Sequence, residues 1–324
     1  MSLSSQGLQL GGTIIPVCIG VQLNAFNYIQ TVLHQQREGG MQTVGWLISS
    51  ISLSNIVVEL SCFWLVALVW MNMIIINEVV QPGLKASLFF WLGSCCVSFW
   101  SIAWLSLFYC MKVVSFTTTF FRALKRNISS VINKALLISV LGSYILFSPF
   151  FTLQLQIDML NVPSTTNTTN ISYSANLVFA SWINVDLYTM LFLCFLIPLP
   201  LMIMLPTSLR LVVHLCKHVM ALHQNQTQCQ SLDSYLRVCK LTVSLVGIYL
   251  TTLIIMSFYF ISELIQSNVS YHIIICSCTF YCIMSGALLT ASNKFLKEKL
   301  LKILCCKEPP DTSGKCQTAD TEVT

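Results

Sequence analysis

Side chains suited to binding chemistry stand inside apolar stretches of this sequence. Glu59 is the only charged residue between Glu38 and Glu78, and a carboxylate within a membrane span costs roughly a few kcal/mol unless it is partnered, hydrated or protonated. Trp100 and Trp104 lie four residues apart, and therefore on one face of a helix. Their indoles offer flat faces for stacking and cation–π contacts, and one N–H group each. Both features indicate noncovalent binding, although packing between helices would also explain them.

Three roles are open to Glu59. It follows Asn55 by one helical turn, so a polar cluster that includes both side chains is the simplest arrangement. In that cluster a neutral, hydrogen-bonded Glu59 would only hold helices together. The alternatives are a conformational switch or ion sensor, and direct contact with a ligand.

The composition decides the class of protein. Of the 324 residues, 55% are apolar and only 9% are charged, and the mean hydropathy is +0.75. Soluble domains carry roughly 25% charged residues, so a soluble enzyme and a nucleic-acid-binding protein are both excluded. Most of the 15 cysteines fall in apolar stretches, where they are expected as buried small hydrophobes rather than as a disulfide framework. We expect no metal site, no cofactor and no nucleic-acid partner.

Charge-poor stretches predict an all-α membrane protein, because a spanning helix needs about 20 residues with few charges. A receptor-like domain is expected over residues 1–303, followed by a tail at 304–324 without regular structure. A cleaved signal peptide is not expected, since the first stretch lacks a basic segment. The seven predicted helices lie at about 9–32, 45–76, 87–111, 134–156, 186–209, 240–262 and 271–292.

The positive charges predict the orientation. Apart from Lys85, every Lys and Arg residue falls in the loops after the first, third and fifth predicted helices or in the C-terminal tail. Loops rich in Lys and Arg stay in the cytoplasm. The N terminus is therefore expected outside, the C terminus inside, and the chain as a multi-pass protein of the plasma membrane.

Seven helices in this orientation leave a receptor, a retinal-type pump, or a small transporter or channel. A retinal pump needs a Schiff-base lysine in its last helix, and residues 271–292 contain none. A transporter would be expected to show internal repeats or charged relays, and Glu59 is the only ionisable residue near the middle of a span. A receptor is the favoured class.

Two runs identify a resemblance. Residues 105–116 read LSLFYCMKVVSF and residues 120–128 read FFRALKRNI. They resemble the patterns L-S-x-F-Y-x-L-K-I-A-x-F-S and F-L-x-L-K-x-R-I of the bitter taste receptors, the taste receptor type 2 family. Weaker similarities extend along most of the chain, at Asn24, Leu53, Pro200, Lys240 and residues 293–297.

The sequence departs from that family at three places. The family's Ser-Arg in the second helix reads Ser54-Asn55, its sixth-helix His is Tyr235, and its Pro-x-x-His-Ser in the seventh helix reads as residues 282–286, CIMSG. The chain is therefore a divergent member by its motifs. A vomeronasal type 1-like chemosensory receptor is the nearest alternative, and a small membrane transporter is less favoured.

The resemblance implies a seven-helix G-protein-coupled receptor without catalysis, which binds small bitter agonists in the outer half of the bundle. By this resemblance, Trp100 occupies the position of a third-helix tryptophan that contacts ligands in many members. Asn24 occupies the position of an asparagine that faces the second helix. A heterotrimeric G protein of gustducin or Gi type is the implied partner. The basic inner face is expected to contact it through Tyr109, Lys112, Arg122, Lys125, Arg126, His218 and Lys240.

Further predictions concern the two membrane faces. At the outer mouth, Asp186 and Glu263 would attract cationic ligands or simply be solvated, and the polar stretch 164–172 holds two glycosylation acceptors, Asn167 and Asn170. After the seventh helix, a basic amphipathic segment is expected to lie on membrane lipids. Palmitoylation is expected at the cysteine pair that follows, Cys305 and Cys306.

Overall fold

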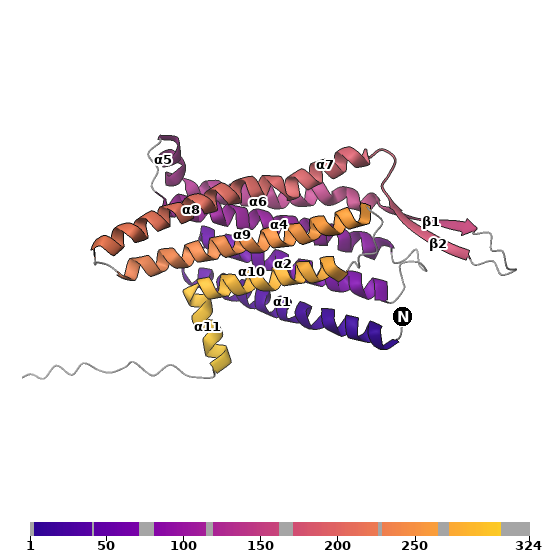
Figure 1. Cartoon of the computed structure of the whole chain (residues 1–324), viewed down its shortest axis with the longest axis horizontal. Helices are drawn as coiled ribbons and strands as arrows, with labels where there is room; N and C mark the ends of the chain where they lie inside the picture. Colours follow the sequence, from indigo (N-terminus) through magenta and orange to yellow (C-terminus); the bar gives the residue numbers. More distant parts are fainter. Residues whose placement is uncertain are drawn as a thin grey trace, which may run out of the picture.

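The computed structural model describes residues 3–40, 42–70, 81–114, 119–161, 171–225, 229–264 and 272–305, which are almost entirely helical (Figure 1). The long helices are α1 (Leu3–Arg37), α2 (Thr43–Trp70), α4 (Gln81–Val113), α6 (Ile128–Phe147), α8 (Pro198–Asn225), α9 (Cys229–Leu264) and α10 (His272–Ser292). Shorter helices are α5 (Thr119–Arg126), α7 (Val185–Leu196) and α11 (Lys294–Cys305).

Among the described residues, six helical segments are long and apolar enough to cross a membrane, with α7 and α8 forming one of them. α1 runs beside them but is not one of the six. The chain is therefore a multi-pass membrane protein. Large apolar side chains project outward from these helices, among them Ile138, Ile145 and Met202, as expected for surfaces that face lipid rather than water.

α4 is the central helix of the bundle. It packs against α2, α6 and α8, while α1 closes the bundle by packing against both α2 and α10. In the most apolar stretch of α4, 67% of the residues are buried, compared with 22% in that of α6. The cysteines with described side chains are free thiols. Seven of them are buried, as the sequence predicted, but Cys18, Cys194, Cys216 and Cys276 are exposed on the outer surface of the helices.

The all-α prediction is wrong in the loop between the fourth and fifth spans. α6 ends at Phe147, a 3-10 helix follows over Ser148–Thr152, and β1 (Gln154–Asn161) pairs with β2 (Ile171–Val178) in an antiparallel hairpin. Pro149 stands in the first turn of the 3-10 helix, where the N–H that proline lacks would have no partner within the helix. The helix predicted over 134–156 thus ends nine residues early.

The fifth predicted helix is broken where two prolines enter it. α7 ends at Leu196 and α8 begins at Pro198. Pro200 has no N–H with which to pair the carbonyl of Leu196. Tyr249 of α9 compensates, because its hydroxyl donates to the carbonyl oxygens of Leu196 at 3.2 Å and Ile197 at 3.0 Å.

Candidate ligand site and signalling face

Trp100 and Trp104 stack on each other, but in a packed region. Their ring centroids are 5.5 Å apart, and Trp100 also contacts Phe195 of α7 at 5.1 Å. The indole N–H of Trp104 donates to Ser139 of α6 at 2.9 Å, and Trp100 is buried. Neither indole lines the cleft between α9 and α10 or the cavity between α2, α4 and α6. The pair therefore faces α6 and α7, and ligand contact by either residue stays a prediction.

Asn24 and Asn55 form the centre of a hydrogen-bond network that joins four helices. The Asn55 amide donates to Asn24 of α1 at 3.2 Å and to Ser285 of α10 at 2.9 Å. Its carbonyl oxygen accepts a hydrogen bond from Ser98 of α4 at 2.8 Å, and Ser98 lies 2.7 Å from the hydroxyl of Tyr281. All of these side chains are buried. The sequence suggested contacts between two helices, and the structure adds α4 and α10.

Glu59 stands one turn from this network and does not join it. Its side chain is completely buried, and both carboxylate oxygens lack a hydrogen-bond partner. It lies beside Thr279 and Cys278 of α10 and against Gly20 of α1, where a Cβ atom would collide with the carboxylate. Gly20 therefore leaves the room that Glu59 occupies.

Other buried polar groups near Glu59 also lack partners. The indole N–H of Trp91 on α4 lies beside the thiol of Cys278, and the hydroxyl of Thr279 lies beside the Glu59 carboxylate, but neither forms a well-aligned hydrogen bond. A carboxylate and two weakly paired donors thus meet where α2, α4 and α10 pack. Leaving one such buried group unsatisfied costs about 1–3 kcal/mol, so this place favours a polar ligand group or water. Trp91 and Thr279 were not predicted as site residues, since neither motif nor spacing shows which helix faces meet.

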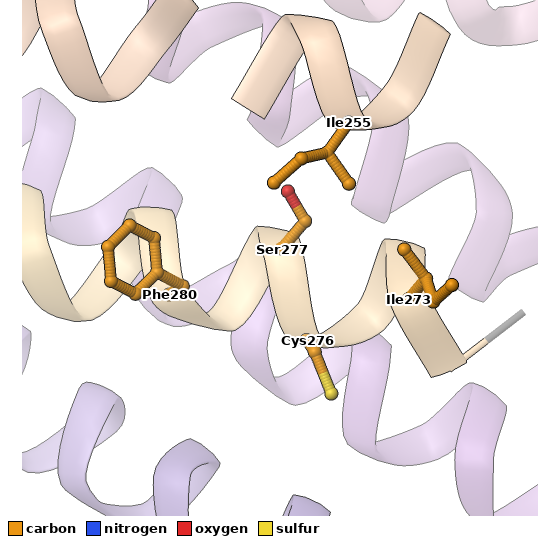
Figure 2. A pocket seen from close by; sticks show the side chains of 5 residues that line it. All are labelled: Ile255, Ile273, Cys276, Ser277 and Phe280. Atoms are coloured by element: carbon orange, nitrogen blue, oxygen red, sulfur yellow. The ribbon is translucent and has the colours of Figure 1, made fainter. Parts of the chain in front are cut away.

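Figure 2 shows a small apolar cleft between α9 and α10, with a volume of about 360 Å³. It is lined by Ile255, Ile273, Cys276, Ser277 and Phe280. Ser277 is buried and its hydroxyl has no partner. Ser277 and Thr279 are two residues apart on α10 and therefore point to different sides of that helix, so the cleft and the Glu59 region lie on different faces of α10.

The predicted outer acidic residues are placed in different ways. Asp186 is exposed in the first turn of α7, where a negative charge stabilises the helix terminus; its position needs no ligand. Glu263 lies in the last turn of α9, and its side chain is outside the described residues. The sugar acceptors Asn167 and Asn170 are also outside them.

The basic segments gather at one end of the bundle. Figure 1 shows α5 and α11 at the end opposite the N-terminus and the β1–β2 hairpin. There, Lys112 is exposed with its ammonium 5.5 Å from the centre of the Phe108 ring, and Lys125 donates to the carbonyl of Val114 at 3.1 Å.

The other predicted coupling residues lie on the same segments. Arg122 and Arg126 are exposed on α5, Lys240 is exposed on α9, and Tyr109 is half-buried beside Phe108. The side chain of His218 is outside the described residues. Among the described residues, this end therefore carries several exposed cations, and one of its lysines, Lys294, lies 3.9 Å from Glu298 on α11.

α11 begins directly after α10 and turns away from the bundle axis (Figure 1). Asn293 caps it, because its side-chain oxygen accepts from the backbone N–H of Phe295 at 3.1 Å. The ring of Phe295 stacks on His34 of α1 at 4.2 Å. Cys305 is the last residue of α11 and Cys306 lies outside the described residues, so palmitoylation there stays a prediction.

Comparison with known proteins assigns the chain to a family. The model of the taste receptor protein family (TAS2R) matches residues 5–308. The chain is 33% identical to chicken (Gallus gallus) taste receptor type 2 member 40 over 162 residues, which are 48% of this chain and 50% of that receptor.

Two primate receptors match over longer stretches. Taste receptor type 2 member 7 of Papio hamadryas is 26% identical over 76% of this chain and 77% of its own length. Taste receptor type 2 member 20 of the gorilla is 26% identical over 90% of this chain and 91% of its own. With a family match along nearly the whole sequence, the chain belongs to the taste receptor type 2 family, the bitter taste receptors, which are G-protein-coupled receptors and not enzymes.

Proposed function

We propose that this receptor binds small bitter agonists between α2, α4 and α10, with a polar or cationic group of the agonist against Glu59. The supporting observation is the buried Glu59 carboxylate without a well-aligned hydrogen bond or a counter-ion among the described residues, beside the weakly paired donors of Thr279 and Trp91. A cationic group that enters this site compensates for the desolvation of the carboxylate. Trp100 and Trp104 then contribute chiefly by packing α4 against α6 and α7.

The proposed orientation places this site in the outer half of a seven-span bundle. α1 is counted as the first span, the receptor domain covers residues 1–303, and the N terminus lies outside the plasma membrane. The clustering of α5 and α11 at one end supports this orientation, because positively charged segments stay cytoplasmic.

The basic end is proposed to contact a heterotrimeric G protein of gustducin or Gi type. Lys112 lies 21 residues after Trp91 on α4, which separates them by about 31 Å at 1.5 Å per residue. It is therefore too far from Glu59 for agonist contact. Its ammonium suits the carbonyl groups at the C-terminus of a partner helix, which carry partial negative charge.

Calcium imaging tests this function. Cells expressing the receptor with a gustducin-chimeric Gα are challenged with a panel of cationic and neutral bitter compounds, and cells without the receptor serve as the control. We expect receptor-dependent responses, and a Gi-selective toxin will separate the two G-protein types. Equal responses in both cell lines to every compound would contradict the proposal.

A further inference from the structure

α1 lies along one edge of the bundle and leaves one of its faces uncovered (Figure 1). Its inner face packs against α2 and α10, and its last turn meets α11 through the stacked rings of His34 and Phe295. Ile15 and Ile29 lie on the opposite face of the helix and are exposed. This outer face of α1 therefore meets lipid or another protein.

The outer face of α1 repeats every seven residues. Its members are three and four residues apart in alternation, cover three heptads, and are not buried. They are Gly12, Ile15, Ile19, Gln22, Phe26, Ile29 and Leu33. This is the spacing of the seam along which two helices pack in a coiled coil, and the open space around Gly12 lets a second backbone approach. An apolar stripe would also suit lipid, so the spacing alone does not identify a partner.

Gln22 is the polar member of this seam, and it lies deep in the bilayer. Asn24, two residues further along α1, bonds to Asn55 near the middle of α2. Gln22 stands fifteen residues before Arg37, the last residue of α1, and hence about 22 Å from the basic end. Its amide is exposed, and no hydrogen bond among the described residues involves it. Because hydrocarbon offers no hydrogen bonds, this amide needs a polar group from outside the chain.

We propose that α1 pairs with α1 of a second copy of this receptor along this seam, with the two Gln22 amides hydrogen-bonded to each other. All copies of a multi-pass protein cross the membrane in the same direction, so two α1 helices that meet side by side are parallel. In a parallel pair each seam residue faces its own counterpart, and Gln22 therefore meets Gln22.

The chemistry of the amide fits this occupant. An amide carries two donors and an acceptor, so it can pair with a copy of itself, and amide side chains hydrogen-bond across helices in membranes. A lipid offers Gln22 no such group, since the polar groups of lipids lie at the surfaces of the hydrocarbon core. The inference rests on α1 as the first span. It does not depend on the agonist site at Glu59 or on contact with a G protein.

Energy transfer between labelled receptors tests the pairing. Full-length receptors that carry a donor or an acceptor fluorophore at the C terminus are coexpressed over a range of surface densities. We expect transfer that saturates as the ratio of acceptor to donor rises. Gln22→Leu keeps a side chain of similar size and removes the amide, and it is expected to weaken the association constant at least about three-fold. Transfer that rises linearly with density and never saturates would overturn the pairing.

Two matched variants localise the interface. Ile15→Ala and Ile138→Ala make the same change on isoleucines that are 64% and 69% exposed, the first on the α1 seam and the second on α6. Only Ile15→Ala is expected to lower the energy transfer at matched surface density. Transfer that stays unchanged in both Gln22→Leu and Ile15→Ala would contradict pairing through α1. The calcium response of each variant is measured in parallel, and reduced pairing with an intact response separates this inference from the proposed function.

Discussion

Glu59 is enclosed by three helices without a hydrogen-bond partner, and an agonist cation is the partner that we propose for it. Glu59→Gln keeps the shape of the side chain but removes the negative charge. The potency of cationic agonists is expected to fall at least about ten-fold, since truncating a buried charge pair is costly, while neutral agonists keep theirs. Dose–response curves of the calcium signal measure this. Asp186→Asn is the matched control, because it makes the same change on an exposed residue.

The two tryptophan positions on α4 separate ligand contact from packing. Neither indole N–H forms a well-aligned hydrogen bond, but Trp91 lies beside Cys278 near Glu59, whereas Trp100 is stacked against Trp104 and Phe195. Trp91→Ala is expected to shift agonist potency about ten-fold or more. Trp100→Ala is expected to lower thermal stability and surface expression, with little change in potency at matched expression. If Trp100→Ala lowers agonist potency and Trp91→Ala does not, the agonist binds against Trp100, as the sequence predicted.

At the scale of elements, Tyr249 holds the break between α7 and α8 together. Tyr249→Phe removes both hydrogen bonds to the carbonyls of Leu196 and Ile197. The Ile197 carbonyl keeps the backbone N–H of Leu201 at 3.3 Å, so the Leu196 carbonyl is the group left unsatisfied. The cost is expected to be about 1–3 kcal/mol, visible as a lower melting temperature of the purified receptor. Tyr28→Phe, a half-buried tyrosine on α1, is the comparison. An unchanged melting temperature of Tyr249→Phe would show that water replaces the hydroxyl.

Lys112 tests the signalling end of α4. Lys112→Met keeps an apolar stem for Phe108 and removes the cation. Agonist binding is expected to stay near normal while the calcium signal collapses, because the ammonium is proposed to contact the G protein. If Lys112 only reaches lipid headgroups, both should stay nearly intact. Lys85→Met, at the opposite end of the same helix, controls for the loss of one charge.

The elements were predictable to different degrees from the sequence. Gaps between charges located the long helices, because a bilayer span excludes most charges. The hairpin was missed, although Gln154-Leu155-Gln156-Ile157 alternates polar and apolar residues as a strand does. This short signal directly follows an apolar helix. The break at Pro198 was not predicted, because a proline in a membrane helix does not by itself indicate a break: membrane helices tolerate prolines when another side chain pairs the freed carbonyl. Here the hydroxyl of Tyr249 pairs it.

The candidate site was less predictable, because a sequence does not show which faces of distant helices meet. Asn55 and Glu59 are one turn apart on α2, yet Asn55 bonds to three other helices and Glu59 to none. The difference depends on Ser98, Ser285 and Tyr281, which come from parts of the chain 43 to 230 residues away. Only the packed bundle brings them together.

In the whole molecule, the Asn55 network lies between the proposed agonist site and the basic end. A movement of α10 relative to α2 would strain the hydrogen bond of Asn55 to Ser285, and a movement of α10 relative to α1 would strain that of Asn24 to the Cys282 carbonyl. These are discrete contacts that are either made or broken, as a two-state element requires. A hydrogen-bond network of this kind can bias the position of α4, whose far end carries Lys112.

The orientation of the whole molecule is tested by its sequons. The proposed topology places Asn167 and Asn170 outside, whereas Asn127 at the start of α6 and Asn225 at the end of α8 belong to sequons at the opposite, basic end. Only the lumenal side of the membrane meets the glycosylation machinery during synthesis. Removal of sugar by a glycosidase is therefore expected to increase gel mobility, and Asn167→Gln with Asn170→Gln to abolish most of that shift. The double variant Asn127→Gln with Asn225→Gln should leave the mobility shift unchanged. If the shift is instead lost in this double variant and kept in the Asn167 and Asn170 variant, the topology is the reverse of the one proposed.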